Sequence, residues 1–149
     1  VLMGGGFAIA QGFQASKLTQ FIGMQLAGAA VLGRFWLTFF IMACVNFLTE
    51  VTSNTATANV LLPILAAVSA EVMMHPLALL LPATVACSLA FMLPAATPPN
   101  AVVFATRRVG IFEFVTGGIA MNLPTSLAGT FLVYFMASAV YDVDGPFPE

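Results

Sequence analysis

The sequence predicts an all-α integral membrane protein with a re-entrant helical hairpin and a discontinuous transmembrane helix. Of its 149 residues, 60% are hydrophobic and only 7% are charged, whereas soluble domains carry about 25% charged residues. No Asp, Glu, Lys or Arg lies between Glu71 and Arg107, or between Glu113 and Asp142. Each interval exceeds the ~20 residues that a helix needs to cross a bilayer. Two short polar interruptions, residues 49–55 and 88–100, break the apolar sequence.

The first two segments are predicted from small and polar residues. Residues 1–16 indicate the end of a transmembrane helix, in which three consecutive glycines at 4–6 let neighbouring helices approach closely. Residues 17–32 mix polar and apolar side chains without a clean stripe, which favours an interfacial connector over a full crossing. Because the chain starts at Val1 with no initiator Met, we expect it to be the carboxyl-terminal portion of a longer membrane protein, or one piece of a divided one.

Residues 33–74 are predicted to form the re-entrant hairpin, with its tip at residues 49–55. Arg34 and Trp36 mark its entry at the membrane interface. The tip contains hydroxyls, amides and one carboxylate, but no Gly, Pro or Lys, which surface loops more often contain. Two full crossings joined by a polar loop fit the same pattern, although the composition of the tip favours the hairpin.

Residues 76–106 are predicted to form the broken helix, with the break at residues 95–100. Pro98 and Pro99 lack an amide hydrogen and clash with the preceding turn, so a helix that enters this stretch must stop. The polar backbone groups freed at membrane depth need protein, water or a ligand, because lipid cannot satisfy them. Arg107 and Arg108 end this segment at a membrane face, and residues 111–141 are long enough for a last transmembrane helix with some tilt.

The two interruptions supply groups that can bind a cation and an anion together. Sodium is a hard cation that should prefer oxygen ligands, and such oxygens come from Thr49, Thr52, Ser53, Asn54, Thr97 and the Ala96 carbonyl. The helix that starts after each interruption would offer amide hydrogens and a positive dipole end to a carboxylate, as in transporters built on discontinuous helices. Ser and Thr in membrane helices also bond back to the preceding turn. Either stretch alone is therefore equally compatible with a structural role, and the two together favour a ligand site.

Glu50 is the only carboxylate expected at membrane depth. It would either set the electrostatic field near a cation or accept hydrogen bonds from amides at the hairpin tip, and the sequence favours neither role. No Ser/His/Asp set, metal-ligand cluster or phosphate-binding glycine loop can be assembled, so neither an enzyme nor an organic cofactor is expected. Cys44 and Cys87 lie in apolar segments and are expected to be small core residues. With no basic patch, nucleic acid is not an expected partner.

Two motifs resemble those of the divalent-anion/sodium symporters, a family that carries dicarboxylates, citrate or sulfate. Residues 53–55, Ser-Asn-Thr, resemble the family's hairpin-tip motif. Residues 88–100 resemble its long signature near the carboxyl terminus, through Ser88, Phe91 and the run Pro-Ala-Ala-Thr-Pro-Pro-Asn at 94–100. The second motif is specific because many positions match in order, whereas the first is weak alone but sits at the expected distance. The resemblance covers essentially the whole chain.

The resemblance implies a homodimer with two inverted repeats, in which a transport domain moves like an elevator against a scaffold. This chain would hold most of the second repeat, and the first repeat with its own sodium site would be missing. The family motif places a sodium site at Thr49, Thr52, Ser53, Asn54 and Ala96. It places substrate contacts at Asn54, Thr55 and Pro98, with Thr97 and Asn100 close by.

The implied function is sodium-coupled symport of divalent anions, most of all C4-dicarboxylates, by a multi-pass protein of the cell membrane. The family's orientation would put Arg107 and Arg108 in the cytoplasm. Two alternatives stay open: a membrane-embedded scaffold or assembly subunit with no transport role, and a relative that is proton-coupled or exchanges anions.

Overall fold

The computed structural model describes residues 33–141, together with residues 8, 11–12, 15–18, 20–21 and 24. Its helices are α3 (Arg34–Thr49), α4 (Asn54–Glu71), α5 (Pro76–Ala86), α6 (Pro98–Ala105) and α7 (Ile111–Tyr141). The predicted all-helical class is confirmed for the described residues, among which no strand occurs. The predictions for residues 1–16 and 17–32 fall mostly outside the described part of the chain and stay predictions.

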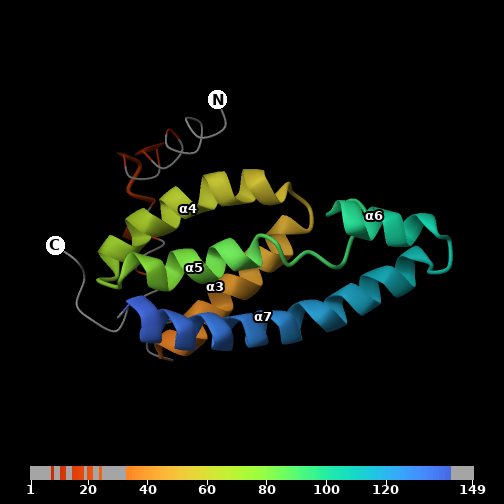
Figure 1. Ribbon diagram of the computed structural model, residues 1–149. Coiled ribbons are helices and arrows are strands. Elements are labelled where there is room, and N and C mark those ends of the chain that lie inside the picture. Colours follow the sequence, from red (N-terminus) through yellow and green to blue (C-terminus); the bar gives the residue numbers. More distant parts are fainter. Residues whose placement is uncertain are drawn as a thin grey trace.

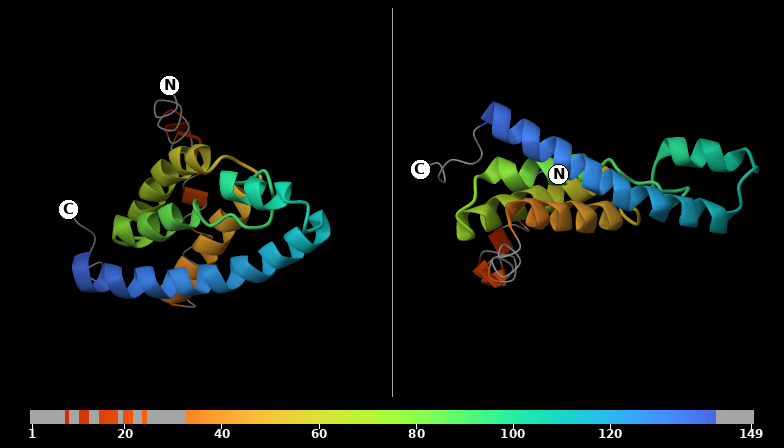
Figure 2. Two further views of the ribbon diagram at one scale, coloured as in Figure 1. Left: turned by 45° about the vertical axis from the view of Figure 1, so that its right-hand side comes forward. Right: turned by 90° about the horizontal axis from the view of Figure 1, so that it is seen from below.

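The helices form one elongated bundle with α6 standing apart from it. Helices α3, α4 and α5 lie together, and α7 packs against α3 and α5 and extends past the end of α5 (Figure 1). Both views of Figure 2 show α6 past the end of α5, beside the first turns of α7. An edge-to-face contact between Phe104 and Phe114, with ring centroids 6.0 Å apart, joins α6 to α7. The non-helical stretch between α5 and α6 therefore lies next to α7 and close to the loop between α3 and α4.

The core lies where α3, α4 and α5 meet. Close packing of small and aliphatic side chains is the main attraction between helices in lipid, where no hydrophobic force draws them together. Helix α5 contributes mainly small or aliphatic residues to this contact. The buried side chains of the cluster are Leu37, Ile41, Met42, Val45, Leu65, Leu79, Ala83, Ala86 and Cys87.

The non-helical stretch between α5 and α6 begins earlier in the chain than the prolines suggested. The prediction placed it at residues 95–100, whereas the non-helical residues are 87–97 and Pro98 and Pro99 are the first two residues of α6. Proline suits the first turn of a helix because the amide hydrogen it lacks would have no intrahelical partner there. The two prolines therefore begin the second helix rather than end the first. Pro76 begins α5 in the same way, after His75 at the N-cap.

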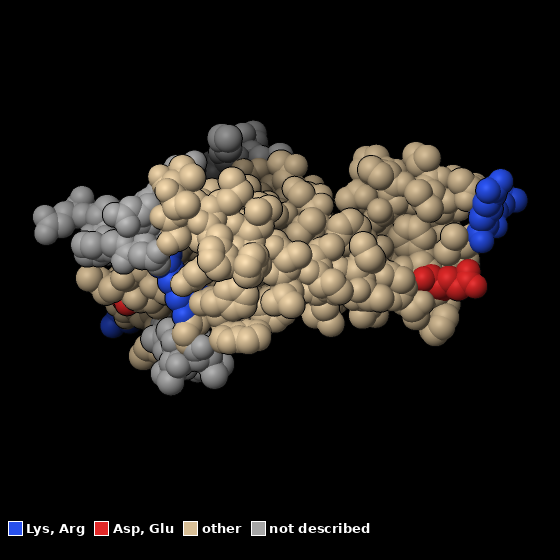
Figure 3. Space-filling model, turned by 60° about the horizontal axis from the view of Figure 1, so that its bottom comes forward, with Lys and Arg blue, Asp and Glu red and all other residues tan. Residues whose placement is uncertain are grey.

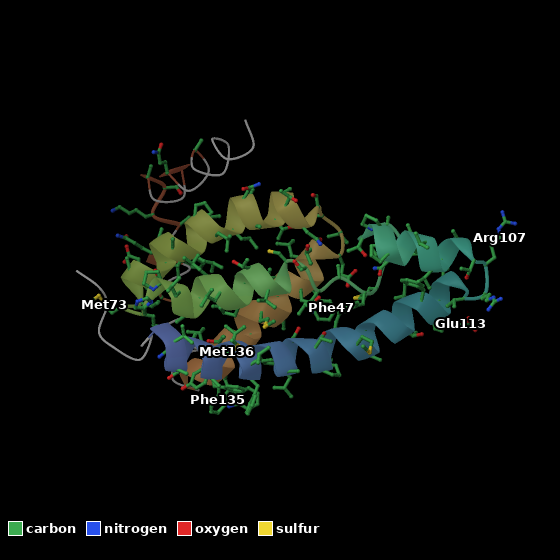
Figure 4. All side chains as sticks on the ribbon, in the orientation of Figure 1. Phe47, Met73, Arg107, Glu113, Phe135 and Met136 are labelled. Atoms are coloured by element: carbon green, nitrogen blue, oxygen red, sulfur yellow. The ribbon has the colours of Figure 1, made fainter. Side chains whose placement is uncertain are left out.

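Apart from the buried Glu50, the charged side chains drawn in Figure 3 lie toward the two ends of the molecule. In the described part of the chain, one helix is long and apolar enough to cross a membrane, over Ile111–Val140, and α3 and α5 are shorter apolar helices. Arg107 and Glu113 lie at the end of the molecule where α6 ends and α7 begins, and Met73 lies at the opposite end of the bundle (Figure 4). On the face shown in Figure 3, the surface between the two ends carries no Lys, Arg, Asp or Glu. This distribution is typical of a protein with an apolar belt in a bilayer.

Candidate functional site

The tip between α3 and α4 and the non-helical stretch between α5 and α6 border one pocket of about 780 Å³. Of the site residues predicted from the sequence, the pocket brings together Thr52, Ser53, Asn54, Thr55, Ala96, Thr97 and Pro98. Thr49 and Asn100 are not among its lining residues and lie behind it. Both bordering segments lie between the charged ends of the molecule (Figure 4).

The Thr49 hydroxyl and two other oxygen atoms lie close together behind the pocket wall. Its side chain is completely buried, and its hydroxyl lies 2.7 Å from Asn54 Oδ1 and 3.1 Å from the Cys87 carbonyl oxygen. A threonine hydroxyl has one hydrogen to donate, so it can serve only one of the two acceptors at a time. A cluster of one hydroxyl, one amide oxygen and one carbonyl is the kind of neutral oxygen set that a hard cation prefers.

The starts of α4 and α6 differ in what they can offer an anion. Ser53, the N-cap residue of α4, makes no side-chain capping hydrogen bond, so the first amides of α4 lack a side-chain partner at the edge of the pocket. In α6 the first two residues are prolines, and Thr97 caps the helix by accepting a hydrogen bond from the Asn100 amide at 3.5 Å. The sequence predicted an anion-binding helix start after both interruptions. The structure leaves free amide donors only at α4.

Two of the predicted site residues use their polar groups within the protein. The Thr52 hydroxyl donates to the Leu48 carbonyl at 2.9 Å, which is the back-bonding expected of threonine after a helical turn. The Asn100 side chain donates to the carbonyls of Ala90 and Leu93, at 2.8 and 3.1 Å. Asn100 thus holds the non-helical stretch in shape from behind, and its amide hydrogens are not directed into the pocket.

Glu50 binds the backbone of the non-helical stretch. Its carboxylate accepts hydrogen bonds from the amides of Phe91, Met92 and Leu93 at 2.6, 2.9 and 3.2 Å, and from Asn122 Nδ2 at 2.8 Å. Of the two roles that the sequence left open, the structure shows the acceptor. The amides come from the non-helical stretch between α5 and α6 rather than from the loop between α3 and α4.

A stripe of small and polar residues on α7 forms the wall behind Glu50, and sequence reasoning did not assign it. Gly118, Asn122, Ser126 and Thr130 are all buried, and Asn46 on α3 donates to Ser126 Oγ at 2.9 Å. Residues four apart share one face of a helix, so the spacing 118, 122, 126, 130 in an apolar span was the signal that could have found them. Small and polar residues at such spacing are typical of close contacts between membrane helices.

The apolar composition, the helical fold and the long helix α7 define a helical membrane protein. Residues 1–138 match the family described as the sodium:sulfate symporter transmembrane region, and the chain belongs to this family. It is 42% identical over 144 residues to the sodium-dependent dicarboxylate transporter SdcS of Staphylococcus saprophyticus, covering 97% of this chain and 28% of that protein. It is 39% identical over 149 residues to the Na(+)/dicarboxylate cotransporter 3 of Rattus norvegicus, covering 100% of this chain and 25% of the relative.

The chain thus spans about a quarter of the length of the curated relatives that it matches. The family predicted from the two motifs is confirmed. The relatives are transporters by name and not enzymes, as the sequence analysis expected of this chain.

Proposed function

We propose that the protein containing this chain carries out sodium-coupled symport of divalent anions, most of all C4-dicarboxylates. This chain supplies one half of the substrate site and one sodium site. The observation that carries the proposal is the pocket of about 780 Å³, which is bordered by an uncapped helix start and has a set of neutral oxygens directly behind its wall. The names of the family and of the relatives describe sodium-dependent transport of sulfate or dicarboxylates, which supports the same function.

The sodium site is proposed at Thr49, Thr52, Ser53, Asn54 and Ala96. The Thr49 hydroxyl donates to Asn54 Oδ1 at 2.7 Å, so the two oxygens already lie side by side, and a bound sodium ion would replace this hydrogen bond. Since the Thr52 hydroxyl donates to a carbonyl, Thr52 would serve sodium through an oxygen lone pair. Ala96 would serve through its carbonyl, in a stretch where the backbone is not helical.

The substrate carboxylate is proposed to bind at the start of α4. Amides without a cap at a helix N-terminus attract an anion through their hydrogens and the positive end of the helix dipole. Asn54 and Thr55 are the first two residues of α4 and line the pocket. Pro98 and Thr97 line the opposite wall, and Asn100 supports that wall through its two hydrogen bonds to carbonyls.

In the membrane, α3 and α4 would form the two arms of a re-entrant hairpin, and α5 and α6 the two halves of one discontinuous transmembrane helix. The tip and the break lie between the charged ends of the molecule. Unpaired backbone groups at such a depth require protein, water or a ligand as partners. The remaining contacts to substrate would come from the first repeat, outside this chain, in a homodimer of the cell membrane.

The test is uptake of radiolabelled succinate into proteoliposomes by the full-length parent protein, with and without an inward sodium gradient. We expect sodium-dependent uptake, competition by citrate or sulfate to define the substrate range, and loss of uptake in Asn54→Ala. The matched control is Asn59→Ala, which makes the same change on the same helix outside the lining of the pocket.

Three results would contradict the proposal. No uptake of succinate, citrate or sulfate would favour a scaffold or assembly subunit. Unchanged uptake when choline replaces sodium at fixed pH would favour a proton-coupled or exchanging relative. Equal uptake by Asn54→Ala and Asn59→Ala would remove the tip from the site.

A further inference from the structure

We propose that Glu50 is a positioning residue of the transport site. Its carboxylate holds residues 91–93 in the shape that presents residues 93–98 to the pocket, and it binds neither sodium nor substrate. The statement that this positioning serves transport rests on the proposed function. The statement that Glu50 positions residues 91–93 rests on hydrogen bonds alone.

The backbone amides of residues 91–93 have left the helical pattern and need an acceptor. In an unbroken helix each would donate to the carbonyl four residues earlier, but α5 ends at Ala86 and the chain is not helical again until Pro98. Glu50 accepts from all three consecutive amides, at 2.6 to 3.2 Å. One side chain on α3 therefore replaces the missing helical partners of the break.

Most of the acceptor capacity of Glu50 is used by the protein. Oε1 accepts from the amides of Phe91 and Met92 and from the Asn122 side chain, and Oε2 accepts from the Leu93 amide. Each oxygen of an ionised carboxylate offers about two lone-pair sites, so Oε1 is fully used and Oε2 keeps one site. Glu50 borders the pocket, but only 4% of its surface is exposed, so its main contacts are to N–H donors of the protein.

Helix α7 locks this arrangement from the far side. Asn122 must present its Nδ2 to Glu50, because a carboxylate only accepts hydrogen bonds. Asn46, which lies one helical turn before Glu50, donates to the backbone carbonyl of Asn122 at 3.4 Å and to Ser126 Oγ at 2.9 Å. These two bonds join α3 to α7 beside Glu50, and the Asn122 side chain is bound by Glu50 itself.

The backbone of α7 also touches the segment that Glu50 holds. A Cβ placed on Gly118 would lie 2.3 Å from Met92 Cα and 2.6 Å from the Phe91 carbonyl oxygen. Asn100 binds the carbonyls of the same segment while Glu50 binds its amides. Both the amides and the carbonyls of the segment that leads into the pocket wall are therefore hydrogen-bonded, and Glu50 makes more of these bonds than Asn100 does.

The experiment compares Glu50→Gln, Glu50→Asp, Asn122→Ala and the double variant Glu50→Gln/Asn122→Ala in the full-length transporter. Glu71→Gln is the control, since Glu71 is exposed at the last residue of α4, away from the pocket. A glutamine at position 50 turns one acceptor oxygen into an NH₂ group that faces N–H donors. We expect Glu50→Gln to lower the maximal rate of succinate uptake at least tenfold and to raise the half-saturation constants for succinate and for sodium together.

Asn122→Ala should move both constants in the same direction by a smaller factor, and the double variant should be no worse than Glu50→Gln, because the two residues act as one unit. Glu50→Asp keeps the charge and should recover part of the activity. A rise in the sodium constant alone, with Asn122→Ala silent, would show that Glu50 is a sodium ligand and overturn the proposal.

A labelling measurement keeps the proposal testable if Glu50→Gln is inactive. Ala95 is exposed in the wall of the pocket, so Ala95→Cys in a Cys44→Ser background reports the shape of that wall through its rate of reaction with a water-soluble thiol reagent. We expect Glu50→Gln to change this rate several-fold in the absence of ligand and to abolish protection by sodium with succinate. Glu71→Gln should leave both unchanged.

An unchanged rate in Glu50→Gln would overturn the positioning role. The ligand-free rate does not depend on transport. If the native protein takes up no succinate, the proposed function fails while this comparison still decides the role of Glu50.

Discussion

The contact between Gly118 and the non-helical stretch between α5 and α6 can be tested by adding a single methyl group. In Gly118→Ala, the new Cβ would meet the backbone of Met92 at 2.3 Å from Cα and 2.6 Å from N. Ordinary contacts between carbon atoms are about 3.5–4.0 Å, and neither backbone is the free end of a side chain that can turn away. The non-helical segment must therefore move away from α7 by roughly 1 Å, the difference between those distances.

A shift of that size exceeds the tolerance of the hydrogen bonds to Glu50. The bond from the Met92 amide is 2.9 Å and that from Leu93 is 3.2 Å, and an added ~1 Å takes either beyond hydrogen-bonding distance. Overpacking costs about 1–3 kcal/mol and a lost hydrogen bond to a charged group about 1.5–3 kcal/mol. Alanine regains about 1 kcal/mol of helix propensity. The balance is a loss of about 1.5–5 kcal/mol.

Gly117→Ala is the matched control, because a Cβ at Gly117 meets nothing within 4 Å. Both variants would be measured in the full-length protein for melting temperature in detergent and for succinate uptake in proteoliposomes. We expect Gly118→Ala to melt several degrees lower and to transport at least tenfold more slowly, and Gly117→Ala to match the native protein. If the two variants behave alike, α7 does not set the position of the broken helix and the reasoning is refuted.

Three further substitutions test other parts of the site in the same uptake assay. Thr49→Val removes the hydroxyl from the oxygen cluster and should raise the sodium half-saturation constant at least tenfold, while Thr49→Ser should change it by less than a factor of three. Equal sodium constants in the two variants would show that the hydroxyl does not bind sodium. Asn100→Ala leaves two carbonyls of the broken segment without their donor and should lower the maximal rate more than it changes sodium affinity, which a selective sodium effect would contradict. Asn46→Ala breaks the link between α3 and α7 and should lower the melting temperature by several degrees, as two lost buried hydrogen bonds at about 1 kcal/mol each imply; an unchanged melting temperature would show that the link is dispensable.

The helical class could be predicted from the sequence because it follows from composition and from uncharged intervals, which do not depend on tertiary contacts. The bounds of the non-helical stretch could not. Pro98 and Pro99 are compatible with ending one helix or with starting the next. The structure shows them in the first turn of α6, while Glu50 accepts hydrogen bonds from the amides of residues 91–93. That contact joins residues about forty positions apart and has no local sequence signal.

The roles of the individual site residues could not be predicted from the sequence either. Most of the predicted residues border one pocket because they are contiguous in two short polar stretches. Their individual roles depend on neighbours that only the fold supplies. The Thr97 hydroxyl caps α6 and the Asn100 side chain binds carbonyls, and neither use can be distinguished from ligand binding by residue type.

The difference between the starts of α4 and α6 has a consequence for selectivity between dicarboxylates of different chain length. Because α6 begins with two prolines under a threonine cap while α4 begins uncapped, only one of the two helix starts at the pocket keeps amides for a negative group. Under the proposed function this chain binds a single carboxylate of the substrate, and its contribution to affinity does not depend on the distance between the two carboxylates. Chain-length selectivity, such as succinate over glutarate, would then be encoded in the other repeat and would travel with that repeat in chimeras between relatives.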